Sequence, residues 1–201
     1  MKIIIPVAGE GRRLRPYTHT KPKPLLSVAG KPMIDHVMDK ILPLKPTEVI
    51  FIIGHLKHRM EKHLRDKYPK VNLRFIEQRE IIGTAGAIGL AREAFNEDVL
   101  IDFGDTIFDA DLSVIKKCND DGIIWGMQVE DYQRFGVMVT DGSSYLQKIV
   151  EKPKVPVSKL ANIGLYYIKN TKLLEKGIDR ELANRKEGQE AFLTGAFEYM
   201  V

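Results

Sequence analysis

The chain has 201 residues, enough for one domain with a sizeable buried core. Its 31 basic and 27 acidic residues leave a net charge of +4 that is spread along the chain, which argues against duplex nucleic-acid binding but suits small anionic ligands. The single cysteine, Cys118, excludes disulfide frameworks and multi-cysteine metal sites. The first apolar run, Ile3–Ala8, is too short for a membrane span or a signal core. We therefore expect a soluble cytoplasmic protein that binds neither nucleic acid nor membrane; a homo-oligomer is compatible with this composition.

Over the first hundred residues, short apolar runs alternate with longer amphipathic stretches. The apolar runs predict strands at Lys2–Val7, Val49–Ile53, Leu73–Ile76 and Val99–Phe103. The amphipathic stretches predict helices at Met33–Leu42, Lys57–Tyr68 and Thr84–Phe95. Apolar strands separated by helices indicate an α/β fold with a parallel sheet covered on both faces. Ligands of such sheets bind beyond the carboxyl ends of the strands, so the loops after Val7, Ile76 and Phe103 should converge on one crevice.

After Asp121 the pattern changes to short strand-like runs separated by turns. These runs are Ile123–Val129, Gly136–Val139, Leu146–Val150 and Gly164–Ile168. They predict added antiparallel structure as a second wall of the crevice, followed by helices over Thr171–Arg185 and from Ala191 onward. Because no linker separates the halves, we expect residues 1–201 to form a single domain with two lobes, residues 1–121 and 122–201.

A glycine-rich turn directly follows the first predicted strand. Gly9 and Gly11 let backbone N–H groups approach a phosphate closely, because no side chain blocks them. Five cations lie within about a dozen residues of this turn: Arg12, Arg13, Arg15, Lys21 and Lys23. A strongly anionic ligand such as a triphosphate fits this segment. The alternative interpretation is a solvated basic loop.

Two common nucleotide motifs do not fit. Leu14 occupies the position of the third glycine of a dinucleotide-binding fingerprint, and the second strand ends in Ile53-Gly54-His55 without an acidic residue. A Walker P-loop is excluded because Gly30-Lys31 is followed by Pro32.

The segment that joins the third strand to the next helix carries a candidate base-binding group. The Gln78 amide offers a donor and an acceptor to a base edge, and Gly83 would let a flat ring lie against the backbone. Gly83-Thr84 is equally compatible with a simple helix N-terminus.

Gly104-Asp105 ends the fourth strand, on the side where ligands bind. A carboxylate there suits magnesium, which takes one or two carboxylates together with substrate phosphates. The alternative for Asp105 is a cap for the segment beginning near Asp109, or ordinary turn chemistry.

Glu151-Lys152 and Asn162 flank strands of the second lobe. The Glu could accept hydrogen bonds from sugar hydroxyls while the Lys holds a phosphate; taken singly, such a pair is usually a surface pair of little consequence.

Together and in this order, five segments resemble the sugar-1-phosphate nucleotidyltransferases, the NDP-sugar pyrophosphorylases, and the resemblance covers nearly the whole chain. The segments are Gly9–Pro16 with Lys23-Pro24, Gly83-Thr84-Ala85, Gly104-Asp105, Phe135-Gly136-Val137, and Glu151-Lys152-Pro153 with Asn162-Ile163-Gly164. Within this family, the sequence most resembles the glucose-1-phosphate thymidylyltransferases and their uridylyltransferase relatives. The resemblance implies a Rossmann-like, mostly parallel sheet of the nucleotide-diphospho-sugar transferase type with an added antiparallel sugar-binding lobe.

The resemblance also implies the reaction and the residue roles. The phosphate of a sugar 1-phosphate attacks the α-phosphorus of an NTP in line and releases pyrophosphate, so catalysis is positioning plus charge neutralisation. The implied catalytic residues are Arg13, Lys23 and Asp105, of which Asp105 holds Mg²⁺. The implied nucleotide-binding residues are Ala8, Gly9, Gly11, Arg12, Gln78, Gly83, Thr84 and Gly104. The implied sugar-phosphate-binding residues are Gly136, Glu151, Lys152 and Asn162.

The chain departs from the family pattern in places. Arg12 stands where the family has Thr, Glu10 stands where many members have a small residue, and Leu193-Thr194-Gly195 stands where relatives read L-T-D. Relatives continue to a W-x-D-x-G segment that carries a second metal ligand, whereas this sequence ends at Val201, so we expect a C-terminally short second lobe.

Three functions follow from these residues. The first is an active sugar-1-phosphate nucleotidyltransferase, with glucose 1-phosphate and dTTP or UTP as the best pair. The second is a catalytically weak relative that binds a nucleotide or sugar nucleotide. The third is a transferase with another specificity, either a mannose-1-phosphate guanylyltransferase or a phosphoalcohol cytidylyltransferase.

Overall fold

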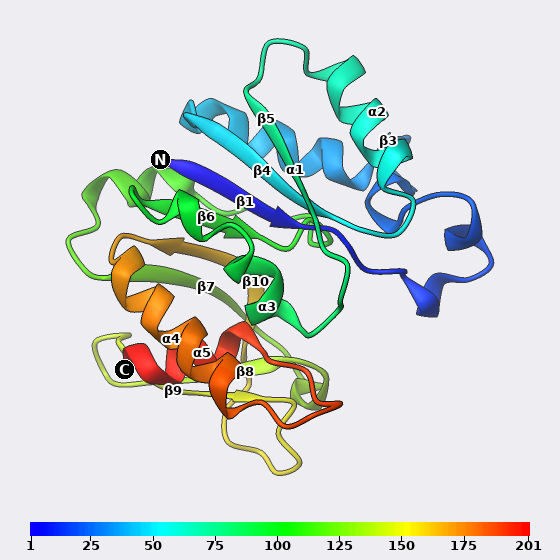
Figure 1. Cartoon of the computed structure of the whole chain (residues 1–201). Coiled ribbons are helices and arrows are strands. Elements are labelled where there is room, and N and C mark those ends of the chain that lie inside the picture. Colours follow the sequence, from blue (N-terminus) through cyan, green and yellow to red (C-terminus); the bar gives the residue numbers. More distant parts are fainter.

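The computed structural model describes residues 1–201, and an eight-stranded sheet forms its centre (Figure 1). The strand order is β5-β4-β1-β6-β10-β8-β9, and β7 also pairs with β10. The strands are β1 (Lys2–Pro6), β4 (Glu48–Ile53), β5 (Leu73–Glu77), β6 (Val99–Asp102), β7 (Gly122–Gln128), β8 (Gly136–Thr140), β9 (Leu146–Glu151) and β10 (Leu160–Ile168). A separate two-stranded antiparallel sheet joins β2 (Ser27–Val28) to β3 (Lys31–Pro32).

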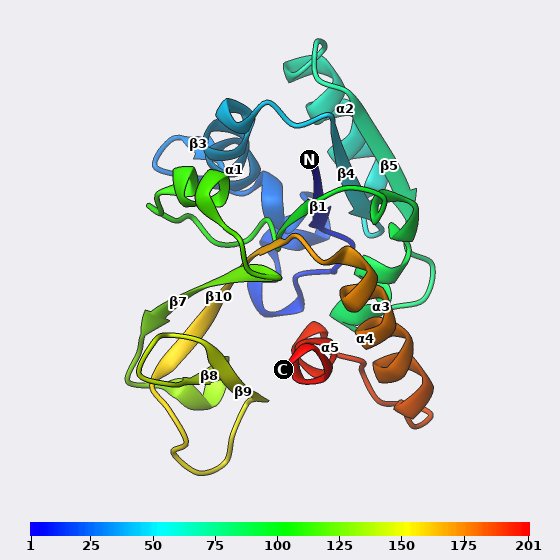
Figure 2. The same cartoon turned by 90° about the vertical axis from the view of Figure 1, so that its left-hand side faces the viewer.

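The first half of the chain builds the parallel part of the large sheet. β1 pairs in parallel with β4 and β6, and β4 pairs in parallel with β5. β10 then runs antiparallel to β6, and β7 and β8 pair antiparallel with β10. The antiparallel strands therefore extend the same sheet, and Figure 2 shows β8 and β9 on the far side of β10 from the parallel strands. The predicted α/β fold with an antiparallel addition is confirmed.

Helices cover both faces of the parallel strands (Figure 1). α1 (Met33–Ile41) and α2 (Lys57–Lys67) cover one face; α3 (Thr84–Gly89), α4 (Thr171–Asn184) and α5 (Leu193–Met200) cover the other. Because successive strand residues point to opposite faces, Ile3 and Ile5 pack with α1 and α2 while Ile4 packs with the second group. All three side chains are fully buried, which explains the uninterrupted apolar runs of the sequence.

Two predicted boundaries are wrong. The helix predicted over Thr84–Phe95 ends at Gly89, and only a 3₁₀ turn over Arg92–Ala94 follows. Glycine is a weak helix former, and Gly89 lies where a Cβ would come within 3.3 Å of Ile178 on α4. β10 begins at Leu160, before the predicted start at Gly164, because a bulge around Gly164 interrupts the alternation of side chains.

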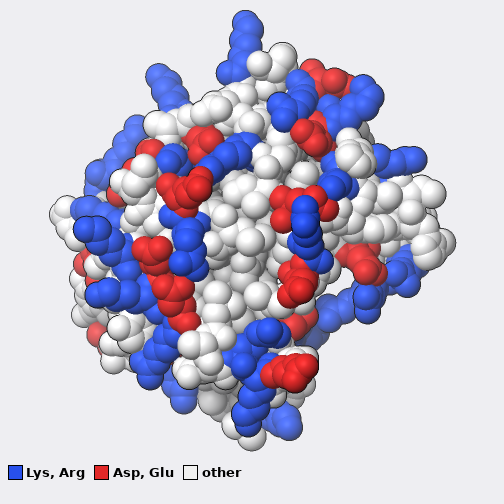
Figure 3. All heavy atoms as spheres, in the orientation of Figure 1, with Lys and Arg blue, Asp and Glu red and all other residues white.

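The surface carries charges of both signs. On the face that Figure 3 shows, basic and acidic side chains are interspersed around a band of uncharged residues. No helix combines the length and the apolar character that crossing a bilayer requires.

Candidate active site

A pocket of about 570 Å³ lies at the carboxyl ends of β1 and β6, where the sequence predicted a crevice. Its walls include six of the predicted site residues: Gly9, Gly11, Arg12, Arg13, Lys23 and Asp105. Leu14, Phe103 and Arg134 also line it. The loops after β1 and β6 thus meet as predicted, whereas no residue of the loop after β5 lines this pocket.

The turn after β1 depends on Gly11. Its φ of +63° lies in the left-handed region, and a Cβ there would come within 2.9 Å of Thr18 Cγ2. The chain then makes a 3₁₀ turn over Arg12–Leu14, which carries Arg12 and Arg13 into the pocket wall. The predicted residue Ala8 does not line the pocket: it is buried, and Gly54 packs against its backbone and Cβ.

Lys23 and Asp105 meet across the pocket. Lys23 Nζ lies 2.6 Å from Asp105 Oδ2, although 82 positions separate the two residues in the chain. Both side chains are partly exposed, at 31% and 40%, so this ion pair can exchange with charged ligands. Arg13 has no acidic partner in the structure, so its positive charge is uncompensated.

Glu10 holds two arginines of the same turn. Its carboxylate accepts hydrogen bonds from Arg12 Nε at 2.9 Å and Nη2 at 3.2 Å, and from Arg15 Nη2 at 2.9 Å. The Arg12 guanidinium hydrogen bonds hold the pKa of Glu10 below its usual value. Because Glu10 occupies the Nε edge of Arg12, the Nη1 end of that guanidinium stays free for phosphate oxygens. Sequence reasoning missed this role of Glu10; its spacing from Arg12 was the available signal.

Gly104 turns the chain so that Asp105 faces the pocket. Its φ is +68°, and its N–H donates to Asp102 Oδ1 at 2.6 Å. The capping alternative for Asp105 is wrong, because Asp111 caps the following 3₁₀ turn by accepting from the Ser113 N–H.

Asp105 is the only carboxylate in the pocket wall, and no group of three or more metal-ligating side chains gathers in the structure. A partly exposed carboxylate beside a cationic pocket fits one Mg²⁺ ion that also binds substrate phosphates.

Asp102 lies directly behind this turn, 1% exposed, and its Oδ2 has no hydrogen-bond partner. Burial raises its pKa to about 7. The free energy of unfolding therefore falls as the pH rises from about 4, where the Asp102 carboxyl group ionises in the unfolded state, to about 7, where it ionises in the folded state.

We expect Asp102→Asn to raise the free energy of unfolding by roughly 2–4 kcal/mol at about pH 8 and to have little effect near pH 4. The amide retains the acceptor for Gly104 and cannot ionise. Urea unfolding of both proteins across this range checks the result; an effect independent of pH would contradict it.

The second predicted group of residues gathers at the start of β8 and the end of β9. Asn162 Nδ2 donates to Gly136 O at 2.7 Å, and Thr194 Oγ1 donates to Glu151 Oε2 at 3.2 Å. A Cβ at Gly136 would collide with Asn162 and lie 3.0 Å from Glu151 Oε2, so only glycine fits. The structure thus joins Gly136, Glu151 and Asn162, and adds Thr194, which the sequence did not assign to the site.

Lys152 stands at the edge of this second group. Its Nζ lies 3.5 Å from Glu151 Oε1 and 4.9 Å from the centre of the Phe192 ring. Its side chain is 48% exposed, so the ammonium group is accessible to a phosphate.

Tyr166 lies between the two groups. Burial raises the pKa of its hydroxyl, and the carboxylates of Glu151 and Asp105 raise it further. Its ring centre is 5.5 Å from that of Phe103, which lines the cationic pocket. The cationic pocket and the polar group around Glu151 are therefore neighbours across the aromatic pair of buried Tyr166 and half-buried Phe103.

The remaining predicted residues lie outside the pocket wall. Gln78 is 7% exposed, and its backbone N–H donates to Ile53 O at 2.8 Å. The Thr84 hydroxyl accepts from the Leu193 N–H at 2.8 Å, and a Cβ at Gly83 would collide with the Ala191 backbone. Gly83 and Thr84 therefore dock the chain that leads into α5, a contact that sequence reasoning did not foresee.

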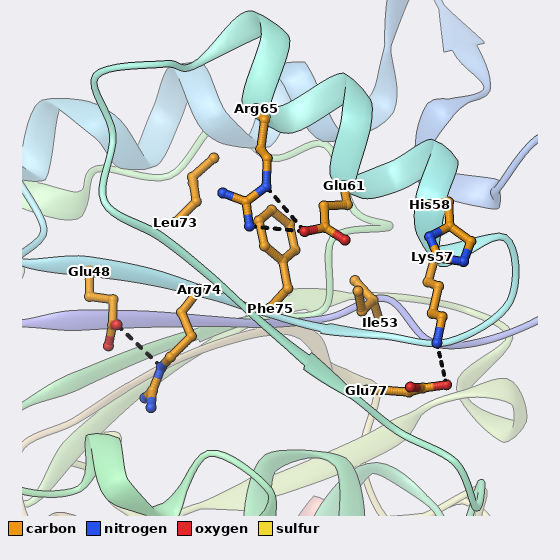
Figure 4. Close-up of a pocket in the computed structure, with 10 residues that line it drawn as sticks. All are labelled: Glu48, Ile53, Lys57, His58, Glu61, Arg65, Leu73, Arg74, Phe75 and Glu77. Atoms are coloured by element: carbon orange, nitrogen blue, oxygen red, sulfur yellow. Dashed lines mark hydrogen bonds and ion pairs between the residues drawn. The ribbon is translucent and has the colours of Figure 1, made fainter.

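A second hollow, of about 560 Å³, lies between α2 and the edge strand β5 (Figure 4). Its charged side chains pair with one another: Lys57 with Glu77 at 2.7 Å, and Arg65 with Glu61 at 2.9 Å. The Arg65 guanidinium also lies 4.8 Å from the Phe75 ring centre. This hollow shares no residue with the cationic pocket, and its charges are neutralised internally.

The chain is similar to known nucleotidyltransferases in sequence and in fold. It is 33% identical to the UTP–glucose-1-phosphate uridylyltransferase AglF of Haloferax volcanii, over 83% of this chain and 71% of that protein. It is 32% identical to mannose-1-phosphate guanyltransferase beta-A of Xenopus laevis, over 94% of this chain and 57% of that protein. The chain thus spans little more than half the length of the second relative. In fold it matches UDP-glucose pyrophosphorylase, solved with UDP-glucose, with a TM-score of 0.85 at 21% identity, over 99% and 86% of the two chains.

The profile of the family described as nucleotidyl transferase matches residues 2–200. That match takes in both the cationic pocket and the polar group around Glu151. The chain belongs to the nucleotidyl transferase family.

Proposed function

We propose that the chain transfers a nucleotidyl group from an NTP to a sugar 1-phosphate, forming an NDP-sugar and pyrophosphate. The observation that carries this proposal is the placement of a cationic pocket and a polar, carboxylate-bearing group side by side across Tyr166 and Phe103. The cationic pocket suits a polyphosphate, and the polar group suits a phosphorylated sugar.

In this reaction a phosphate oxygen of the sugar 1-phosphate forms a bond to the α-phosphorus of the NTP. The bond from that phosphorus to the bridging oxygen breaks, and pyrophosphate leaves with the electron pair. Arg13 and Lys23 neutralise charge on the polyphosphate, and Lys152 holds the sugar phosphate while Glu151 accepts from sugar hydroxyls. Mg²⁺ held by Asp105 and substrate phosphates would add charge neutralisation.

For the other predicted contacts, Asn162 orients the sugar through its amide, and Gln78 offers its side-chain amide to the base. Glucose 1-phosphate with UTP or dTTP is the first pair, supported by the similarity to the uridylyltransferase. Mannose 1-phosphate with GTP is the second, supported by the similarity to the guanyltransferase.

Pyrophosphate release from each NTP with a panel of sugar 1-phosphates, in the presence of Mg²⁺, tests the proposal. We expect one pair to react well above a no-enzyme control, and Asp105→Ala and Lys152→Ala to lower its rate. Ligand-induced stabilisation of roughly 2–3 kcal/mol at a hundredfold excess over Kd, without turnover, would indicate a binding protein instead. Reaction of CTP with a phosphoalcohol alone would indicate the cytidylyltransferase specificity.

A further inference from the structure

One cation of the pocket comes from the second half of the chain. Arg134 ends the 3₁₀ turn Tyr132–Arg134 that leads into β8. All other residues in the pocket wall come from the first 105 residues of the chain. Arg134 therefore brings a positive charge from the antiparallel strands to a pocket that the parallel strands build.

The partners of Arg134 leave it available to a ligand. Its side chain is 73% exposed, and its one acidic partner is Asp131, three residues earlier, at 3.0 Å. An exposed ion pair within one turn contributes at most about 1 kcal/mol, so a multiply charged anion competes with Asp131. Asp131 does not line the pocket, so the carboxylate that offsets part of the Arg134 charge stands outside the pocket wall.

The charge of the wall favours a polyanion. Four cations face the pocket, Arg12, Arg13, Lys23 and Arg134, against the single carboxylate of Asp105. Arginine forks match pairs of phosphate oxygens, so successive phosphates of one chain can engage separate guanidinium groups. A chain of several phosphates offers more charged oxygens than a single phosphate for these cations to share.

We propose that Arg134 is a polyphosphate-binding residue, through which the antiparallel strands contact the triphosphate of the NTP. The proposal rests on the proposed function. Arg134 shares its pocket with the Gly9–Lys23 segment and with none of Glu151, Lys152 and Asn162, which favours the triphosphate over the sugar phosphate. The same turn continues into Gly136 of the polar group, so one short segment contacts both substrates.

Calorimetric titration with inorganic tripolyphosphate and with inorganic phosphate tests this assignment without depending on the base, the sugar or turnover. We expect Arg134→Gln to raise the Kd for tripolyphosphate about tenfold, with little change for inorganic phosphate and an unchanged Tm. Arg134→Lys should restore part of the affinity. The matched control is Arg180→Gln, which removes the same charge from an exposed position on α4 and should leave both constants unchanged.

A double-mutant cycle separates a direct contact from a general charge effect. Asp131→Asn should strengthen tripolyphosphate binding in the wild type, by about two- to threefold, and should have less effect in the Arg134→Gln background. No binding of tripolyphosphate to the wild type, an unchanged Kd in Arg134→Gln, or an equal loss in Arg180→Gln would overturn the assignment. If no NTP and sugar pair turns over while tripolyphosphate binding still depends on Arg134, the proposed function fails and this assignment stands.

Discussion

Lys23→Ala is expected to lower the rate of nucleotidyl transfer by two to three orders of magnitude. Removing one preorganised positive group from a site where phosphate charge develops has an effect of about this size. The Lys23–Asp105 pair is partly exposed, so its loss should reduce the free energy of unfolding by no more than about 1 kcal/mol. Initial-rate measurements of pyrophosphate release, together with thermal unfolding, check both statements.

The matched control for this variant is Lys21→Ala. Lys21 lies two residues earlier in the same basic segment, but it is exposed and does not line the pocket. Its replacement should change the rate by less than about threefold, since a surface charge is screened by solvent. Equal losses in the two variants would show that the segment acts only through its overall charge. Lys23→Arg should retain more activity than Lys23→Ala because it keeps the charge.

Asp35→Asn is expected to lower the free energy of unfolding by roughly 2–4 kcal/mol. Asp35 on α1 has no exposed surface, and its carboxylate accepts from His63 Nε2 at 2.9 Å, Lys67 Nζ at 2.8 Å and Tyr68 Oη at 3.0 Å. These bonds tie α1 to α2 and its C-terminal end. The amide carries no charge, and its NH2 group replaces one of the two acceptor oxygens, so at least one of the three donors meets a donor. Urea unfolding at neutral pH measures the loss.

The pH dependence of this loss has a definite sign. Burial alone would raise the pKa of Asp35, but the hydrogen bonds from Lys67, His63 and Tyr68 outweigh burial and hold that pKa below its usual value. The stabilisation by Asp35 is therefore present above the unfolded-state pKa, 3.8, and is lost as the pH falls through the folded-state value. The difference between wild type and Asp35→Asn should shrink in acid. Asp39→Asn is the control, since Asp39 lies on the same helix with its side chain 60% exposed and should cost less than about 1 kcal/mol.

The parallel part of the fold was predictable because burial leaves a local record in the sequence. Ile3, Ile4 and Ile5 are apolar without interruption since both faces of β1 are covered, and the spacing of Ile34 and Met38 marks the buried side of α1. The predicted element boundaries were wrong at two glycines, one in a helical pattern and one in a strand pattern. Gly89 and Gly164 occupy places where another segment comes close, and that contact is not visible locally.

Part of the candidate site could also be predicted from the sequence, and part could not. The turn around Gly11 and the cations after it could be found because a phosphate site of this kind is built from consecutive residues. Contacts between distant segments could not be predicted. The pairing of Lys23 with Asp105 and the hydrogen bond from Thr194 to Glu151 depend on how the strands are ordered. Arg134 was missed because nothing in the local sequence distinguishes it from an ordinary surface charge.

By itself, the sequence determined the strands and helices of the first half, the glycine turn with its basic residues, and the polar pairs that follow later strands. Backbone geometry and the pattern of buried side chains are determined by residues close together in the sequence, so the sequence alone predicts them. Only the tertiary structure decided that Gly83 and Thr84 dock the chain before α5, and that Arg134 reaches the pocket from the second half. Those outcomes depend on β10 pairing antiparallel with β6, which joins strands of the second half of the chain to the sheet of the first half.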